Sequence, residues 1–197
     1  SLGFYGGGGI DGRHYARGTP LNSALMSGMF GGPKWGADYK KDLEQEFTHT
    51  AAFDGHTTSL PLATNTVTLD PTLKDKWGRP ALRCTYMDHP DDLATMKFFF
   101  DKTGELMEAA GAIRQAGSYP KNGQEGNVHL LGTCRMGNDP ASSVVDKYHR
   151  SHDVSNLFIC DGSSLVTSGR GQPTMTIMAL AFRAADHMIQ SARRGEI

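Results

Sequence analysis

Residues 126–137 read GNVHLLGTCRMG, and this stretch fits neither a regular helix nor a simple strand. It places one histidine, His129, shortly before Gly132, and it follows that glycine with Thr-Cys-Arg-Met-Gly. Taken by itself, a single histidine in such a place is best interpreted as a buried structural residue. The sequence on either side of the stretch is needed to choose between that interpretation and a catalytic one.

Two apolar stretches follow on the C-terminal side. Residues 142–146 (SSVVD) predict a short strand, and residues 154–160 (VSNLFIC) predict a buried strand. The second stretch ends at Asp161 and Gly162, a pair that is typical of a turn.

A helix over residues 173–190 is predicted next. Pro173 suits the first position of a helix, and Gln172 could cap it. The start of a helix carries unpaired N–H groups and a partial positive charge, so it stabilises an electron-rich ligand atom. The glycine-rich turn of residues 169–172 could bring such an atom to the helix, although glycine turns before helices are common. Apolar residues recur along the predicted helix at spacings of four, three and four: Ile177, Ala181, Ala184 and Met188.

On the N-terminal side, three stretches are typical of antiparallel strands: EFTHTAAF (46–53), TNTVTLDP (64–71) and ALRCTYM (81–87). Turns are expected at Asp54-Gly55 and at residues 77–80, and the second strand is expected to close at Asp70-Pro71.

A long helix is then predicted over residues 91–116, since Pro90 suits a helix start and Asp91 and Asp92 favour its positive end. Residues 1–40 lack sustained periodicity and predict irregular loops that lie over a neighbour.

Length and composition narrow the class of protein. The chain has 197 residues, a formal net charge of −1 and a pI near 6.7, which gives no global attraction to nucleic acid or to acidic membranes. Its three cysteines are widely spaced, so they indicate neither a disulfide framework nor a zinc ribbon. No apolar run reaches the roughly 18 residues of a membrane span. The N-terminus has neither a methionine nor a targeting pattern, so we expect a fragment of a longer protein, whose compartment stays open.

Four blocks now stand in order: H-x-x-G-T-C-R-M-G, SVVD, NLFICDGS and GQPTMTIMALAFRAAD. Together they resemble the C-terminal part of the glucose-methanol-choline (GMC) flavoprotein oxidoreductases. The earlier FDGHTTSLPLATNTVTLDP and DKWGRP resemble the substrate domain of the gluconate and sugar dehydrogenase branch of that family. The resemblance covers most of residues 45–190.

The resemblance implies an α/β fold. Residues 41–125 would form a substrate-binding α+β domain with an antiparallel sheet. Residues 126–197 would hold a catalytic turn and then the last strand and helix of a Rossmann-like FAD domain. Residues 1–40 would pack on a half of the FAD domain that this chain does not contain.

The resemblance also implies FAD-dependent oxidation of a hydroxyl group of a sugar or glycoside. His129 stands at the position of the family's catalytic base, and imidazole titrates at about pH 6.5, which suits proton exchange near neutrality. Gln172 stands where the family usually has His or Asn. An amide cannot act as a base, but it can donate a hydrogen bond to a developing alkoxide. Because Gln is longer than Asn by one methylene, Gln172 either positions the substrate differently or only caps the helix.

For the cofactor, the resemblance places Asp161 and Gly162 at the ribityl-pyrophosphate part of FAD. Gln172, Pro173 and Thr174 would face the flavin near N1 and the C2 carbonyl. GFYGGGGIDG is not the G-x-G-x-x-G fingerprint for the ADP half of FAD, because no apolar strand precedes it and no acidic partner follows. We therefore expect an N-terminal FAD-binding chain or segment as a partner.

Two other functions stay open. A cofactor-free carbohydrate-binding or assembly subunit would keep the scaffold without the chemistry, and the glutamine at position 172 is the feature that leaves this alternative open. A metal-dependent hydrolase could use His149 and His152 of HRSH, but no further ligands complete a set of four, so we expect a solvated loop there and no metal site.

Overall fold

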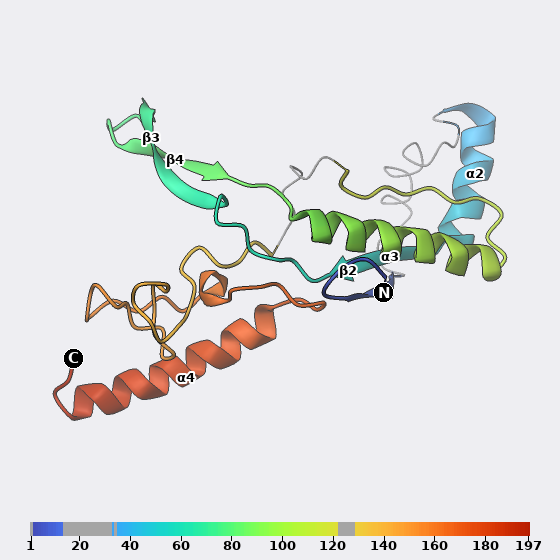
Figure 1. The fold of residues 1–197 in the computed structure, drawn as a ribbon. Coiled ribbons are helices and arrows are strands. Elements are labelled where there is room, and N and C mark those ends of the chain that lie inside the picture. The colour runs from blue at the N-terminus through green and yellow to red at the C-terminus, as the bar shows by residue number, and fades with distance from the viewer. Residues whose placement is uncertain (1, 14–32, 34, 122–128) are drawn as a thin grey trace.

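The computed structural model describes residues 2–13, 33, 35–121 and 129–197. The described part combines helices with antiparallel strands, in agreement with the predicted α/β class, whereas the Rossmann-like return remains a prediction. The elements are arranged openly around a central pair of strands, with helix α4 pointing away from it (Figure 1). In chain order they are β1 (Gly8–Arg13), α2 (Gly36–His49), β2 (Ala52–Thr57), β3 (Thr66–Lys74), β4 (Pro80–Thr85), α3 (Pro90–Ala109), the 3-10 turn η3 (Gly162–Ser164) and α4 (Thr174–Arg193).

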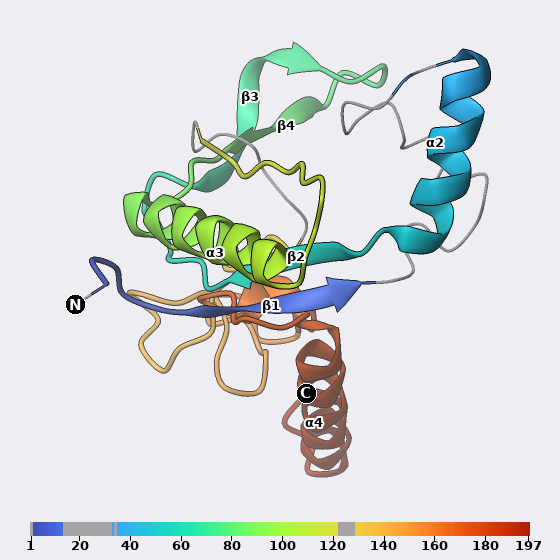
Figure 2. The ribbon, with the colours of Figure 1, turned by 90° about the vertical axis from the view of Figure 1, so that its right-hand side faces the viewer.

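The central pair consists of β1 and β2, which are antiparallel with Gly9 opposite His56. Helix α3 packs across one side of this pair, and the C-terminal loops after residue 129 lie on the other side (Figure 2). Successive residues of a strand face opposite sides. A side chain at Gly8 would collide with Phe99 of α3, while one at Gly9 would collide with Arg170 from the C-terminal part of the chain. The glycines of β1 therefore allow close packing on both faces.

A β-hairpin, formed by β3 and β4, projects from the β1–β2 pair (Figure 1). Its turn includes Gly78, which has a φ of 80°. Such a left-handed conformation suits glycine, and the predicted turn is found there. The predicted end of the strand at residues 70–71 is wrong, because β3 continues to Lys74 through an irregular register.

Helix α3 begins as predicted and ends early. The Nδ1 atom of His89 caps it by accepting a hydrogen bond from the Asp91 N–H, and Pro90 takes the first position. The helix stops at Ala109 because Gly111 has a φ of 83°, so the predicted extension to residue 116 is wrong.

The N-terminal prediction is also corrected. Irregular loops were expected over residues 1–40, but this range contains β1 and the start of α2. The predicted strand over 46–53 is helical up to His49, because the preceding Lys, Glu and Gln residues favour a helix. Residues 14–32 and 34 lie outside the described residues.

The predicted strands 142–146 and 154–160 are absent from the described structure. Only isolated bridges occur there, for example between Val145 and Ser151. The backbone groups are used in hydrogen bonds between crossing loops instead, as from Ile159 N–H to the His149 carbonyl at 2.9 Å. These loops form a compact block with Val145 fully buried.

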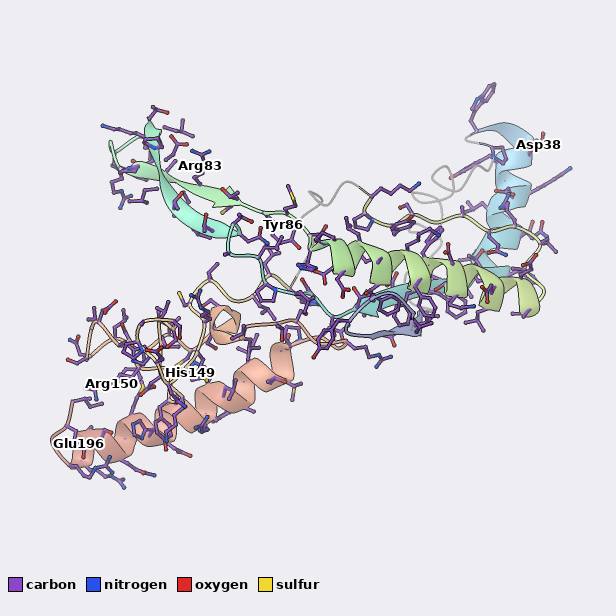
Figure 3. The ribbon with its side chains drawn as sticks, viewed as in Figure 1. Asp38, Arg83, Tyr86, His149, Arg150 and Glu196 are labelled. Atoms are coloured by element: carbon purple, nitrogen blue, oxygen red, sulfur yellow. The ribbon has the colours of Figure 1, made fainter. Side chains whose placement is uncertain are left out.

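Helix α4 packs beside this loop block. Ala184 is buried, and the rings of Tyr148 and His187 stack with centroids 3.8 Å apart. Figure 3 shows His149 within the loops next to the helix. No helix in the described part of the chain is both long enough and apolar enough to cross a bilayer.

Candidate active site

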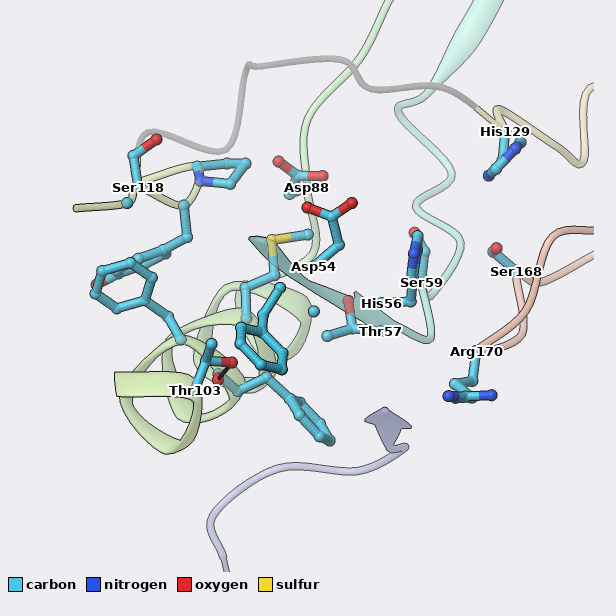
Figure 4. Close-up of a pocket in the computed structure, with 18 of the residues that line it drawn as sticks. Asp54, His56, Thr57, Ser59, Asp88, Thr103, Ser118, His129, Ser168 and Arg170 are labelled. Atoms are coloured by element: carbon cyan, nitrogen blue, oxygen red, sulfur yellow. Dashed lines mark hydrogen bonds between the residues drawn. The ribbon is translucent and has the colours of Figure 1, made fainter. Parts of the chain in front are cut away.

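A cavity of about 2680 Å³ lies where β2, α3 and the C-terminal segments meet. Its wall includes residues 129–133 and 168–172, which come from the two stretches that the sequence singles out. Figure 4 shows His129 and Ser168 on one side of this cavity, with His56 and Ser59 from the end of β2 facing them. Segments far apart in the sequence therefore supply one site.

His129 and Gln172 both line this cavity. His129 is exposed and has a φ of 67°, a left-handed conformation that is uncommon outside glycine. Backbone conformations of this kind persist only where the surroundings impose them, and they gather at functional sites. The two residues for which we predict catalytic roles thus line the same cavity.

Close packing around Gly162 joins the turn that carries His129 to the start of α4. A Cβ atom on Gly162 would lie 2.8 Å from Leu131 Cδ2 and 3.1 Å from Ile177 Cδ1. Leu131 follows His129 by two residues, and Ile177 is in the first turn of α4. The same segments are joined by a hydrogen bond of 3.0 Å from the Cys134 N–H to the Ser163 carbonyl. Gly162 is therefore the point where the histidine turn and the helix start pack together.

The start of α4 carries no side-chain cap. Pro173 already has helical angles, with φ −79° and ψ −8°, and Thr174 is exposed. The predicted capping role of Gln172 is therefore wrong, and Gln172 lines the cavity instead. No capping side chain accepts a hydrogen bond from the first N–H groups of α4.

Asp161 forms hydrogen bonds within its own turn. Its carboxylate accepts hydrogen bonds from the Ser163 N–H at 2.8 Å and from the Ser163 hydroxyl at 2.5 Å. These donors hold the pKa of Asp161 below its usual value. Asp161, Gly162, Pro173 and Thr174 are not among the described residues that line the cavity.

The sequence did not reveal an ion-pair network that links three segments at the cavity. The guanidinium of Arg170 donates to Asp11, and the other oxygen of Asp11 lies 3.6 Å from His56 Nε2. Because Gly9 opposes His56, Asp11 lies diagonally across from His56, and Arg170 lies over Gly9. A glycine-rich strand has no hydrophobic alternation to announce it, so nothing in the sequence pointed to this network.

The HRSH segment differs from its prediction. His149 is buried and its Nδ1 pairs with the Ile159 carbonyl at 2.8 Å. His152 is half-buried, with Nε2 at 2.9 Å from the Ser143 hydroxyl. The expectation of a solvated loop is therefore wrong, because both rings are built into the packed loop block. Among the described residues, no three His, Cys, Asp or Glu side chains are grouped to hold a metal.

A family model described as GMC oxidoreductase matches residues 61–181, which is more than half of the chain. The chain belongs to the GMC oxidoreductases. The match confirms the family that the four sequence blocks predicted.

Individual GMC oxidoreductases are similar to this chain over most of its length. The chain is 42% identical to 2-methyl-1,2-propanediol dehydrogenase of Mycolicibacterium austroafricanum over 78% of this chain and 28% of that protein. It is 37% identical to 6'''-hydroxyparomomycin C oxidase of Streptomyces lividus over 80% and 29%. It is 30% identical to the gluconate 2-dehydrogenase flavoprotein of Pantoea cypripedii over 79% and 26%. The chain thus spans less than a third of the length of these relatives.

GMC oxidoreductases are FAD flavoproteins, and the residues of this chain fit one end of that cofactor. The uncapped start of α4 offers N–H groups, and no other atoms crowd Gly169 and Gly171 beside it. At the ADP end, Gly8–Arg13 does not serve as the fingerprint, because it is a strand paired with β2 and not a phosphate-binding turn before a helix.

Proposed function

We propose that this chain supplies the substrate-binding part and the catalytic turn of an FAD-dependent enzyme that oxidises a hydroxyl group of a sugar or glycoside. The observation that carries the proposal is the presence of His129 and Gln172 in the wall of one cavity. The names of two relatives support the sugar or glycoside class, since they refer to 6'''-hydroxyparomomycin C and gluconate. The name of a third refers to a simple diol, 2-methyl-1,2-propanediol, and supports oxidation of a hydroxyl group only.

FAD, when bound, supplies the acceptor for the hydride that leaves the carbon atom bearing the hydroxyl group. His129 accepts the proton of that hydroxyl group on its imidazole, so the oxygen can form the carbonyl bond of the product. The side chain of Gln172 donates an amide N–H to the same oxygen, which carries developing negative charge. One residue moves the proton and the other orients the oxygen.

The start of α4 is proposed to face the flavin. Pro173 and Thr174 would bring the positive end of the helix dipole to the flavin near N1, where it favours negative charge. Asp161 and Gly162 would meet the ribityl-pyrophosphate part. Both pairs flank the packing between Gly162 and Ile177, which fixes η3 against α4.

An N-terminal FAD-binding chain or segment is the proposed partner. Residues 41–125 would bind substrate, residues 126–197 would return to a Rossmann-like FAD domain, and residues 1–40 would pack on the partner. The large apolar side chains left exposed on α4 support this arrangement, among them Met175, Met178, Phe182 and Ile189.

Anaerobic flavin bleaching tests the proposal. The protein assembled with its FAD-binding portion is expected to be yellow, and a sugar substrate is expected to bleach the flavin. His129→Asn should lower the bleaching rate by roughly 10²- to 10⁴-fold while the flavin stays bound. Asn is the matched replacement, because it tolerates the left-handed backbone at this position.

Unchanged bleaching in His129→Asn would show that another group is the base. The alternative, a catalytically inactive carbohydrate-binding or assembly subunit, predicts sugar binding without any bleaching in the wild-type protein.

A further inference from the structure

Asp88 is a buried acidic residue in the wall of the cavity, two residues before α3. Only 6% of its surface is exposed. Figure 4 shows Asp88 in the wall of the cavity and apart from His129. The mechanism proposed above gives Asp88 no role.

The described residues provide a hydrogen-bond donor to only one of the two carboxyl oxygens of Asp88. Asp88 Oδ1 accepts a hydrogen bond from the Tyr86 hydroxyl at 2.6 Å, whereas no donor among the described residues reaches the buried Oδ2. Burial and the bond to Asp88 raise the pKa of Tyr86, so its hydroxyl remains a donor. A buried oxygen without a partner is unfavourable and is rare in proteins unless it has a function.

A ligand can reach this group through a small motion. Asp88 lines the cavity, and the torsion between Cβ and Cγ of an aspartate is broad, so a partial rotation of the carboxyl group can turn its unpaired oxygen toward the cavity.

The charges of the cavity wall indicate which ligand group fits. The described wall contains three arginines and six acidic residues. Two arginines are already paired, Arg114 with Asp42 at 3.1 Å and Arg170 with Asp11. The third, Arg135, donates to the Ser142 carbonyl at 2.7 Å. Two of the acids are balanced by lysines, Asp101 by Lys97 at 2.5 Å and Glu105 by Lys102 at 2.7 Å, whereas Asp88 forms no ion pair with a described residue. A carboxylate without a cationic partner attracts a cationic donor and repels another carboxylate.

We propose that Asp88 determines specificity in the substrate site by binding a hydrogen-bond donor of the substrate, with an ammonium group preferred to a hydroxyl group and a carboxylate rejected. The substrate class is therefore an amino-bearing sugar or polyol. This inference rests on the proposed function, because it takes the cavity to be the substrate site.

Equilibrium binding tests the inference without turnover. The flavin-loaded protein with its FAD-binding portion is titrated calorimetrically at neutral pH with glucose, 6-amino-6-deoxyglucose and glucuronate. These probes differ in the group on one carbon. The wild type should bind the amino sugar on the order of tenfold more tightly than glucuronate, and Asp88→Asn should bring all three dissociation constants within about threefold.

Asp101→Asn is the matched control, since Asp101 also lines the cavity but is paired with Lys97 at 2.5 Å. It should keep the wild-type order. If Asp88→Asn does not fold, Tyr86→Phe serves instead, because it keeps the carboxyl group and should keep the preference for the amino sugar.

Equal binding of the three probes by the wild type, or no binding of any, overturns the inference, as does a wild-type order in Asp88→Asn. Loss of the preference in Tyr86→Phe also overturns it. Flavin bleaching reports separately on the proposed function: binding with the expected order but no bleaching by any sugar contradicts the oxidation alone.

Discussion

Gln172 shows how one amide can serve either a helix or a ligand. The structure excludes the capping role, since no side chain caps α4, and places Gln172 in the cavity wall. Pro173 restricts the backbone of the residue before it, so the conformation at Gln172 is limited without help from the amide.

Gln172→Ala should therefore leave stability within about 0.5 kcal/mol of the wild type, because it removes an exposed side chain. It should lower kcat/KM by roughly 10- to 100-fold, because an oxygen-orienting donor is lost. Steady-state kinetics and urea unfolding of the assembled protein measure both effects. A stability loss of about 1 kcal/mol with unchanged kinetics would restore the capping role.

Asp92 is a buried acid whose role is structural. It accepts hydrogen bonds from the Leu60 N–H at 3.1 Å and from the Ser59 hydroxyl at 3.2 Å, which fixes the segment after β2 to the start of α3. Burial nevertheless raises the pKa of its carboxyl group above the usual value.

The raised pKa predicts a pH dependence of stability. An unfolded Asp titrates at about pH 3.9, so the contribution of Asp92 is fully present below that pH and is lost as the pH rises through the raised folded-state pKa. Asp92→Asn lacks this titration. Relative to wild type, its free energy of unfolding should rise with pH, by about 1.4 kcal/mol for each unit by which the pKa is raised. Urea unfolding between pH 3.5 and 7 measures the difference, and a difference independent of pH contradicts the assignment.

At the scale of elements, the sequence predicted those with strong local signals. The start of α3 at Pro90 and the turn at Gly78 follow from local backbone preferences. Strand β1 was missed because it consists largely of glycine, which carries no periodicity, and it becomes a strand only by pairing with β2. Residues 154–160 have the apolar run of a buried strand, but in the described structure no neighbouring strand pairs with them.

The same distinction between local signals and distant neighbours applies to the residues of the candidate site. The motif residues His129 and Gln172 were predicted and share a cavity. Asp88, His56 and Arg170 were not, because their significance depends on neighbours that are distant in the sequence. Arg170, for instance, meets Asp11 only through the register of β1 with β2.

Strand β1 provides a test of the network around Arg170. An alanine at Gly9 would displace the guanidinium, which is the flexible end of a side chain, so stability should fall by less than about 1 kcal/mol. The segment before Gln172 would lose its tie to Asp11, and kcat/KM should fall by about threefold to fivefold. Gly7→Ala is the control, since a Cβ there meets no atom within 4 Å. Equal kinetics in both variants would show that the ion pair does not position Gln172.

Across the whole molecule, the described residues form very little apolar core. Val145 and Ala184 are the only hydrophobic residues among them that are buried. Exposed apolar side chains gather instead on one side of α4 and on the β3–β4 hairpin, and an isolated two-stranded hairpin is at best marginally stable in water. Apolar surface on this scale indicates contact with another protein segment.

The chain alone is accordingly expected to bind a hydrophobic dye such as ANS strongly and to lose FAD on gel filtration, whereas the protein assembled with its FAD-binding portion should do neither. Phe182→Glu should weaken assembly, because Phe182 is 73% exposed on α4. Gln190→Glu, which adds the same charge to an exposed position of this helix, should not. A chain that holds FAD by itself without binding the dye would contradict the need for a partner.

The ion pair between Asp11 and Arg170 joins residues 159 positions apart. During synthesis, β1 and β2 leave the ribosome long before Arg170 is made, so the face of the β1–β2 pair that Arg170 covers stays open until then. Proteolytic cleavage between β1 and α2 would for the same reason act at a distance, because release of β1 would free the glycine-rich segment before Gln172. Oxidation should then fail before the α3 region melts, which makes β1 a remote support of the start of α4.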